Sequence, residues 1–76
     1  VLKGIVLGVH RLKNTLNGNP RYKVFVKSNG RTIEYNTEPN GGWIYGIDFY
    51  NLAEKEIEYY SKNKVITILG VEHFYE

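Results

Sequence analysis

The chain of 76 residues contains ten Lys or Arg and eight Asp or Glu, which gives a formal net charge of +2. A chain this short has room for one small hydrophobic core, so we expect one domain spanning residues 1–76. It contains no Cys, which excludes disulfides and thiolate metal sites, and its apolar runs are far shorter than the ~20 residues of a membrane span.

The first predicted strand is segment 3–13, KGIVLGVHRLK. Apolar residues at positions 5, 7 and 9 alternate with a second set at 6, 8 and 10, a pattern typical of a strand buried mainly on one side. Gly4 and Gly8 would allow the bend that a barrel strand requires. Segment 14–20, NTLNGNP, is a predicted loop in which Pro20 biases Asn19 toward extended backbone.

Segments 21–27 (RYKVFVK) and 31–36 (RTIEYN) predict a β-hairpin. Asn29-Gly30 is the strongest short hairpin signal, because a two-residue type I′ turn needs positive φ at both central positions. Such a turn places Ser28 opposite Arg31 and sets every later pair. One face then carries apolar side chains: Tyr22, Val24, Val26, Ile33 and Tyr35. The other face carries Arg21, Lys23, Phe25 and Lys27 beside Thr32, Glu34 and Asn36.

The middle of the chain is less regular. Pro39 and the Gly pair at 41–42 interrupt the strand pattern, and we expect an irregular turn in which Trp43 with Ile44 or Tyr45 plugs one end of the core. Residues 51–60 have two interpretations. A capping box formed by residues 51 and 54 favours a helix, whereas EIEYY alternates as a strand. We favour a helix or turn over 51–55 and a strand from about residue 56.

The final apolar segment, 64–71 (KVITILGV), predicts a central strand with Gly70 as a bend or bulge. The predicted elements are four or five short strands, one tight hairpin and one long crossover. They favour a mainly β fold, a small SH3-like or OB-like partly open barrel of four to five strands with at most one short helix.

Four motifs occur in a distinctive order: NGNPRY before a strand, NGR in the hairpin, GWIYGI, and the closing run KVITILGV. In this order the chain resembles small uncharacterised β-proteins of phages and prophages that carry a GNPRY turn motif. The likeness spans most of the chain, and Gly18 to Tyr22 is its most distinctive part. The chain departs from the group by its longer acidic segment FYNLAEKEIEYY. The resemblance implies a phage or prophage accessory protein in the cytoplasm of a bacterial host cell.

The sequence offers no catalytic motif. Nucleophilic catalysis needs an activated Ser, Thr or Cys beside a base, yet His10 and His73 have no nucleophile elbow or Gly-rich cradle near them. Glu72 and the two histidines lack metal-ligand spacing. We therefore expect no enzyme activity, no metal, no cofactor and no small-molecule substrate.

Charge is divided unequally along the chain. Residues 1–33 contain seven Lys or Arg and no acid, whereas residues 34–76 contain three Lys and eight acids. In one interpretation segment 49–60 covers Phe25 and the acids at 54, 56 and 58 neutralise the basic strand. In the other the basic strand binds nucleic acid, because a cationic groove with an exposed ring is what single strands require.

We favour the second interpretation: a non-enzymatic phage-type accessory module that binds nucleic acid, single-stranded in preference, through the basic face of the 21–36 hairpin. The candidate binding residues are Lys13, Arg21, Lys23, Phe25, Lys27 and Arg31. The alternative is a small inhibitor or modulator of a host or phage protein, as an anti-defence or host-takeover factor would be. Its candidate interface residues are Trp43, Tyr45 and Tyr59. We expect no membrane partner.

Overall fold

The computed structural model describes residues 1–39 and 41–74 of the chain. It contains the strands β1 (Leu2–Leu12), β2 (Arg21–Ser28), β3 (Arg31–Thr37), β4 (Glu56–Lys62) and β5 (Val65–Ile68). Three short 3₁₀ turns complete it: η1 (Gly42–Ile44), η2 (Phe49–Leu52) and η3 (Val71–His73). No α-helix occurs within the described residues.

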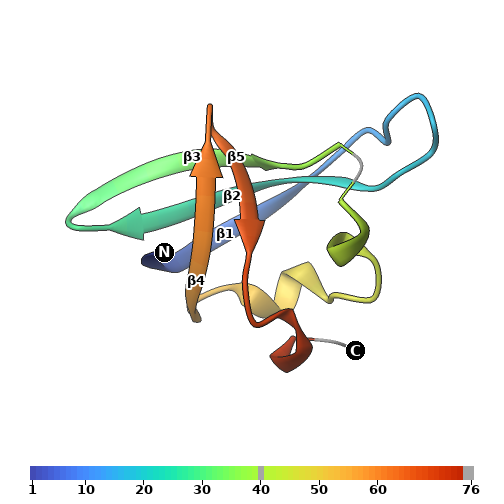
Figure 1. Ribbon diagram of the computed structural model, residues 1–76. Coiled ribbons are helices and arrows are strands. Elements are labelled where there is room, and N and C mark those ends of the chain that lie inside the picture. The colour runs from blue at the N-terminus through green and yellow to red at the C-terminus, as the bar shows by residue number, and fades with distance from the viewer. Residues whose placement is uncertain (40, 75–76) are drawn as a thin grey trace.

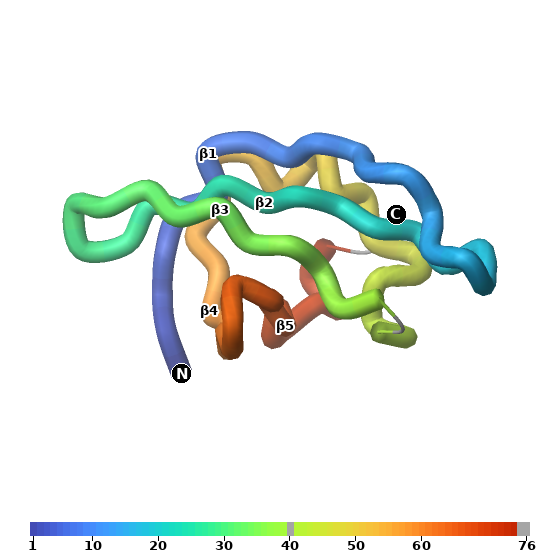
Figure 2. The backbone as a smooth tube through the Cα atoms, turned by 90° about the horizontal axis from the view of Figure 1, so that it is seen from above, coloured from blue at the N-terminus to red at the C-terminus, as the bar shows by residue number. Residues whose placement is uncertain are grey.

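The five strands form a closed barrel in the order β1-β2-β3-β5-β4 (Figures 1 and 2). β1 pairs antiparallel with both β2 and β4, whereas β3 and β5 run parallel. The prediction of a mainly β, small SH3-like or OB-like barrel is confirmed, with five strands and a ring that closes. Closure requires β1 to bend across the barrel, as Figure 2 shows for its first residues.

The predicted hairpin register is confirmed. Asn29 and Gly30 have φ angles of 52° and 77°, as a type I′ turn requires, and Ser28 lies opposite Arg31. The pairs continue without a shift to Lys23 opposite Asn36. The apolar side chains of this register therefore point into the barrel, and the basic ones point outward.

A bulge in β1 changes which residues of that strand face the core. The pairing with β2 shifts between Val6 and Gly8, so the extra residue is Leu7. Val6 is fully buried before the bulge, and Val9 packs against the core after it. Ile5 and Leu7 are left 43% and 48% exposed on the outer surface. The simple alternation of the sequence does not reveal this change of face.

The segment between β3 and β4 closes one end of the barrel. Ile44 is 3% exposed, and the Trp43 ring packs against Phe49 with centroids 6.1 Å apart. The predicted plug therefore consists of Trp43 and Ile44, while Tyr45 is 55% exposed outside it. The expected turn at 51–55 followed by a strand from residue 56 agrees with η2 and β4.

One detail of that segment differs from the expectation. The N-cap of η2 is Asp48, whose carboxylate accepts a hydrogen bond from the Tyr50 amide at 3.1 Å, and not Asn51. Glu54, the expected partner of Asn51 in a capping box, instead has a left-handed φ of 69° and donates its amide to the Val6 carbonyl. The capping-box interpretation is wrong because the chain turns toward β1 at this point.

η2 supplies the centre of the core. Phe49 is 1% exposed and its ring stacks on Tyr22 of β2, with centroids 4.1 Å apart and an interplanar angle of 12°. Leu52 is fully buried beside it. Because Tyr22 points inward, η2 covers the inner side of β2. The buried hydrophobic residues are Val6, Val24, Val26, Tyr35, Ile44, Ile47, Phe49, Leu52, Ile57, Tyr59, Ile66 and Ile68.

We predict that Gly4→Ala destabilises the barrel. A Cβ at this buried position would lie 2.5 Å from Val26 Cγ1 and 2.9 Å from the Lys27 carbonyl oxygen, so β1 could not cross β2 this closely. Overpacking of this kind costs about 1–3 kcal/mol, which urea denaturation would measure. Gly8→Ala in the same strand is the control, because its Cβ would meet nothing within 4 Å. Equal unfolding free energies for the two variants would contradict this account of β1.

Candidate nucleic-acid interface

The outward side chains of β2 form a continuous basic surface. We call Arg21, Lys23, Phe25 and Lys27 the basic face. Lys27 is exposed and the other three are half-buried. Phe25 belongs neither to the buried core nor to the side chains packed against it. Its cross-strand partner on β1 is Gly8. Because Gly8 has no side chain, the space beside the Phe25 ring is open.

The acidic segment does not cover this surface. Phe49 of η2 packs on Tyr22, and Tyr22 points to the opposite side of β2 from Phe25. β4, which carries Glu56 and Glu58, pairs with the first residues of β1 and not with β2. The interpretation in which segment 49–60 buries Phe25 and neutralises the lysines is therefore wrong.

One acid does lie on the basic face. Glu34 of β3 is opposite Phe25, and its Oε2 is 3.8 Å from Lys23 Nζ. The two side chains are 61% and 34% exposed, so water screens the pair and it contributes little to stability. Within residues 1–39 and 41–74 no other Lys or Arg forms an ion pair with a carboxylate. The other charges of the face remain available to a ligand.

Arg11, not Arg21, holds the loop between β1 and β2. Its Nη1 donates to the carbonyls of Leu12 and Arg21 at 3.1 and 2.9 Å, and its Nη2 donates to Asn14. Its guanidinium also lies 5.0 Å from the centroid of the Tyr22 ring. By contrast, the buried Nε of Arg21 has no hydrogen-bond partner within the described residues.

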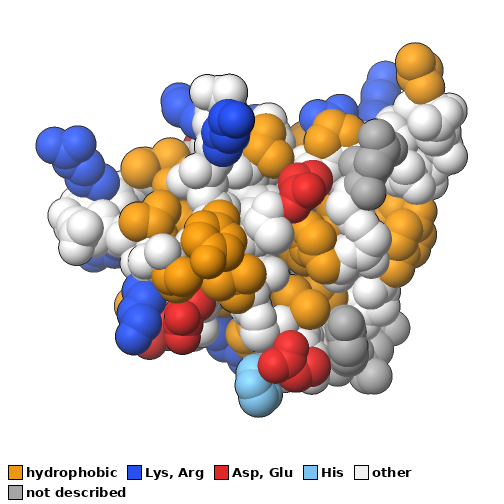
Figure 3. Space-filling view, viewed as in Figure 1, with side chains coloured by type: hydrophobic (Ala, Val, Ile, Leu, Met, Phe, Trp, Pro, Cys, Tyr) orange, Lys and Arg blue, Asp and Glu red, His pale blue; other side chains and the backbone are white. Residues whose placement is uncertain are grey.

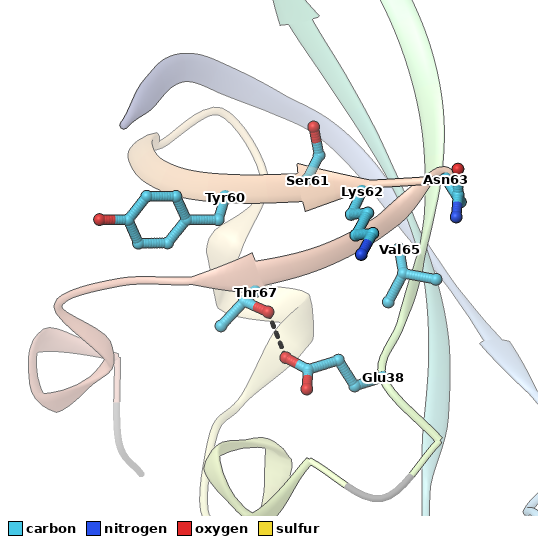
Figure 4. Close-up of a pocket in the computed structure, with 7 residues that line it drawn as sticks. All are labelled: Glu38, Tyr60, Ser61, Lys62, Asn63, Val65 and Thr67. Atoms are coloured by element: carbon cyan, nitrogen blue, oxygen red, sulfur yellow. Dashed lines mark hydrogen bonds between the residues drawn. The ribbon is translucent and has the colours of Figure 1, made fainter.

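The outer surface continues from the basic face across β3 to β5. Asn36, opposite Lys23, pairs with Val65 of β5, and its amide donates to the Lys64 carbonyl at 2.9 Å. A depression of about 400 Å³ follows, lined by Glu38, Tyr60, Ser61, Lys62, Asn63, Val65 and Thr67 (Figure 4). Glu38 Oε1 accepts hydrogen bonds there from Thr67 Oγ1 and, at 3.0 Å, from Trp43 Nε1.

Tyr60 and Lys62 are the site residues that the sequence analysis missed. Tyr60 is 54% exposed and adds a second ring to the outer surface, and Lys62 lies at the rim of the depression (Figure 4). The alternation in segment 56–62 (EIEYYSK) predicts their direction. If Ile57 and Tyr59 face the core, Tyr60 and Lys62 must face outward.

Two other candidate binding residues lie apart from the basic face. Lys13 is exposed in the loop after β1. Arg31 shares the inward-facing side of β3 with Ile33 and Tyr35, so its inclusion in the basic face is wrong. It lines a hollow of about 430 Å³ at the open end of the barrel. The other lining residues of this hollow are Leu2, Ser28, Asn29, Ile33, Tyr35 and Tyr59.

The three candidate residues for a protein interface occupy different environments. Tyr45 is 55% exposed, and its hydroxyl donates to Asn19 Oδ1. Trp43 is half-buried in the plug. Tyr59 is 1% exposed inside the barrel, so its prediction as an exposed interface residue is wrong. Its neighbour Tyr60 has the exposure that the prediction assigned to Tyr59.

Neither a metal site nor a similarity to known proteins defines the candidate interface further. Within residues 1–39 and 41–74 no group of three or more His, Cys, Asp or Glu side chains could hold a metal ion. In the same residues no helix is long and apolar enough to cross a membrane. Comparisons with protein-family models, with curated proteins and with solved structures found no match.

We predict that Phe25→Ala lowers the free energy of unfolding by about 1–2 kcal/mol, because the ring is half-buried on the surface and lies outside the core. Phe49→Ala is the matched comparison, since its ring is 1% exposed and its loss should cost about 3–5 kcal/mol. Urea denaturation of both variants measures the difference. A cost for Phe25→Ala as large as that for Phe49→Ala would mean that Phe25 is a core residue.

We also predict a loss of stability at alkaline pH that depends on Tyr59. Burial, and then its hydrogen bond with Tyr35, raises the pKa of the Tyr59 hydroxyl above the ordinary value of about 10. The unfolded chain therefore releases this proton first, so the stabilisation is complete below pH ~10 and disappears as pH rises through the folded pKa. Tyr59→Phe should lose less stability than the wild type between pH ~9 and ~11 in urea denaturation. Identical losses would contradict the raised pKa.

Proposed function

We propose that the chain is a non-enzymatic module that binds single-stranded nucleic acid along its basic face. The observation that carries this proposal is the position of Phe25. Its ring lies outside the core, half-buried on the outer side of β2, with Lys23 and Lys27 on either side of it along the strand. Single-strand binding needs this combination of a stacking ring and cations that follow the phosphates.

The topology supports the proposal. The strand order β1-β2-β3-β5-β4, with β3 parallel to β5, is the order we assign to an OB-like barrel in preference to an SH3-like one. In OB folds the face of strands 2 and 3 and the loops 1–2 and 4–5 bind oligonucleotides. Here the first loop carries Lys13, and the second is the turn at Asn63 and Lys64.

The proposed ligand path runs across four strands, from β2 over β3 and β5 to β4. Arg21, Lys23 and Lys27 neutralise phosphates, and Phe25 stacks on one base. Beyond Asn36 the bound oligonucleotide reaches the depression. There Tyr60 stacks on a further base, and Lys62 contacts a phosphate of the oligonucleotide. Each stacked base contributes about 1–3 kcal/mol, and the ring faces select no particular base. We therefore expect binding without strong sequence preference.

The setting of this activity is also a proposal. The GNPRY-type resemblance supports a phage or prophage accessory protein that works in the cytoplasm of a bacterial host. The basic face carries no nucleophile beside a base, so the proposed role includes binding and no chemical step.

A protein ligand for the same surface is the second candidate. Ile5 and Leu7 of β1 are 43% and 48% exposed, and they border the basic face at Lys27 and Phe25. Apolar side chains beside a cationic row would suit a host or phage protein that the chain inhibits or modulates. The salt dependence of the affinity distinguishes the two candidates. Phosphate contacts make the affinity fall steeply as ionic strength rises, whereas an apolar protein interface is much less sensitive to salt.

We predict that Lys23→Glu with Lys27→Glu abolishes nucleic-acid binding and leaves the fold intact. Fluorescence anisotropy of a labelled oligothymidylate at two salt concentrations measures affinity, and circular dichroism checks folding. For the wild type, each phosphate contact should contribute roughly 0.7 to the slope of log affinity against log salt concentration. Lys3→Glu with Lys55→Glu is the control, because it makes the same change in net charge at exposed positions outside the basic face. Equal affinities of the two double variants would reject the proposed function.

A further inference from the structure

Part of β3 has a free edge. β2 pairs with β3 from Arg31 onward, but β5 pairs only with Asn36 and Thr37. Within the described residues, the backbone of residues 31–35 therefore has no partner strand on the side away from β2. We call residues 31–35 the free edge. Figure 1 shows the β2–β3 hairpin extending beyond β4 and β5 on this side.

The hydrogen-bonding groups of two residues point out from this edge. In an antiparallel pair, successive residues direct their amides alternately toward and away from the neighbouring strand. The Asn36 amide points away from β2, because it donates to the Lys64 carbonyl at 2.9 Å. Thr32 and Glu34 have the same orientation as Asn36. Their N–H and C=O groups form an exposed ladder that a short extended strand can complete.

The hollow beneath the free edge can bind side chains of an added strand. Arg31, Ile33 and Tyr35 direct their side chains toward this space of about 430 Å³, and Leu2 forms its far wall with 45% of its surface exposed. A strand added to the edge would place every second side chain over the hollow. The lining is mainly apolar, so the central inward side chain of the added strand should be apolar.

Positive charge lies at both ends of the free edge. Arg31 is exposed at one end, and the turn that carries Lys64 closes the other, with Lys62 beside it. The face drawn in Figure 3 shows apolar side chains at its centre, with Lys or Arg at its margins and separate acidic side chains among them. A second copy of this chain would suit the edge poorly, since antiparallel pairing about Ile33 would bring its Arg31 toward Lys64.

From these four features we propose that the free edge binds an acidic, extended segment of a partner protein as an added β-strand. The backbone groups of Thr32 and Glu34 hold its main chain, the hollow takes its central apolar side chain, and Arg31 and Lys64 hold carboxylates at its two ends. This is strand addition, in which main-chain hydrogen bonds give affinity and alternate side-chain pockets give specificity. The site is separate from the basic face, so it does not depend on the proposed nucleic-acid binding.

Amide hydrogen exchange by NMR tests the proposal with a defined probe, the capped peptide Glu-Asp-Thr-Val-Thr-Asp-Glu, whose central Val is the apolar side chain for the hollow. In the free protein the Thr32 and Glu34 amides should exchange much faster than those of Ile33 and Tyr35, which face β2. Saturating peptide should slow Thr32 and Glu34 about tenfold or more and leave Arg21, at the far end of the basic face, unshifted. A peptide N-methylated at the central residue and at both residues beside it, and one with Lys in place of each acid, should both fail to bind.

Two variants complete the test. Arg31→Glu should weaken peptide binding about tenfold and retain oligonucleotide binding. Thr32→Pro removes an edge amide that β2 does not use, and should abolish peptide binding. Slow exchange of Thr32 and Glu34 in the free protein would overturn the proposal. So would unchanged exchange with millimolar peptide, equal binding of the lysine peptide, or a dimer in sedimentation velocity that Thr32→Pro dissolves.

Discussion

The two-residue turn at Asn29 and Gly30 is the constraint on which the rest of the structure depends. Both residues have positive φ, and the turn sets every pair of the β2–β3 hairpin. A shift of one residue would send Lys23 and Phe25 into the barrel and Val24 out of it. Burial of two lysines without partners would cost more than a domain of this size can offset. The register therefore defines both the core and the basic face.

Packing inside the barrel keeps the outer surface uncovered. η2 places Phe49 against Tyr22 on the inner side of β2, so the aromatic residues divide into a buried group and an exposed group. The buried rings account for much of the apolar area in a chain without Met. Phe25 and Tyr60 lie outside that core and are not needed to fill it. Rings beside cations on an open sheet face are the features that a single-strand interface uses.

Local signals in the sequence were enough to predict the hairpin, the Trp43 plug and the strand after residue 55, because turn chemistry and alternation determine them. Long-range features were not predictable in this way. The bulge at Leu7 reverses the inward face of β1, and the parallel pairing of Asn36 with Val65 joins segments far apart in the chain. The inward direction of Arg31 could be predicted from the sequence, since the hairpin register places it on the same side of β3 as Ile33 and Tyr35.

One small barrel carries two separate proposed binding surfaces, a basic face for nucleic acid and a free strand edge for a peptide. Chemical-shift mapping of the labelled protein during titration with a short oligothymidylate tests the central claim most directly, since it reads every residue at once. We expect the shifts to trace a continuous path from Arg21 through Phe25 and Asn36 to Tyr60, and to fade as salt is raised. Shifts confined to Trp43 and Tyr45, or no shifts at millimolar oligonucleotide, would contradict it.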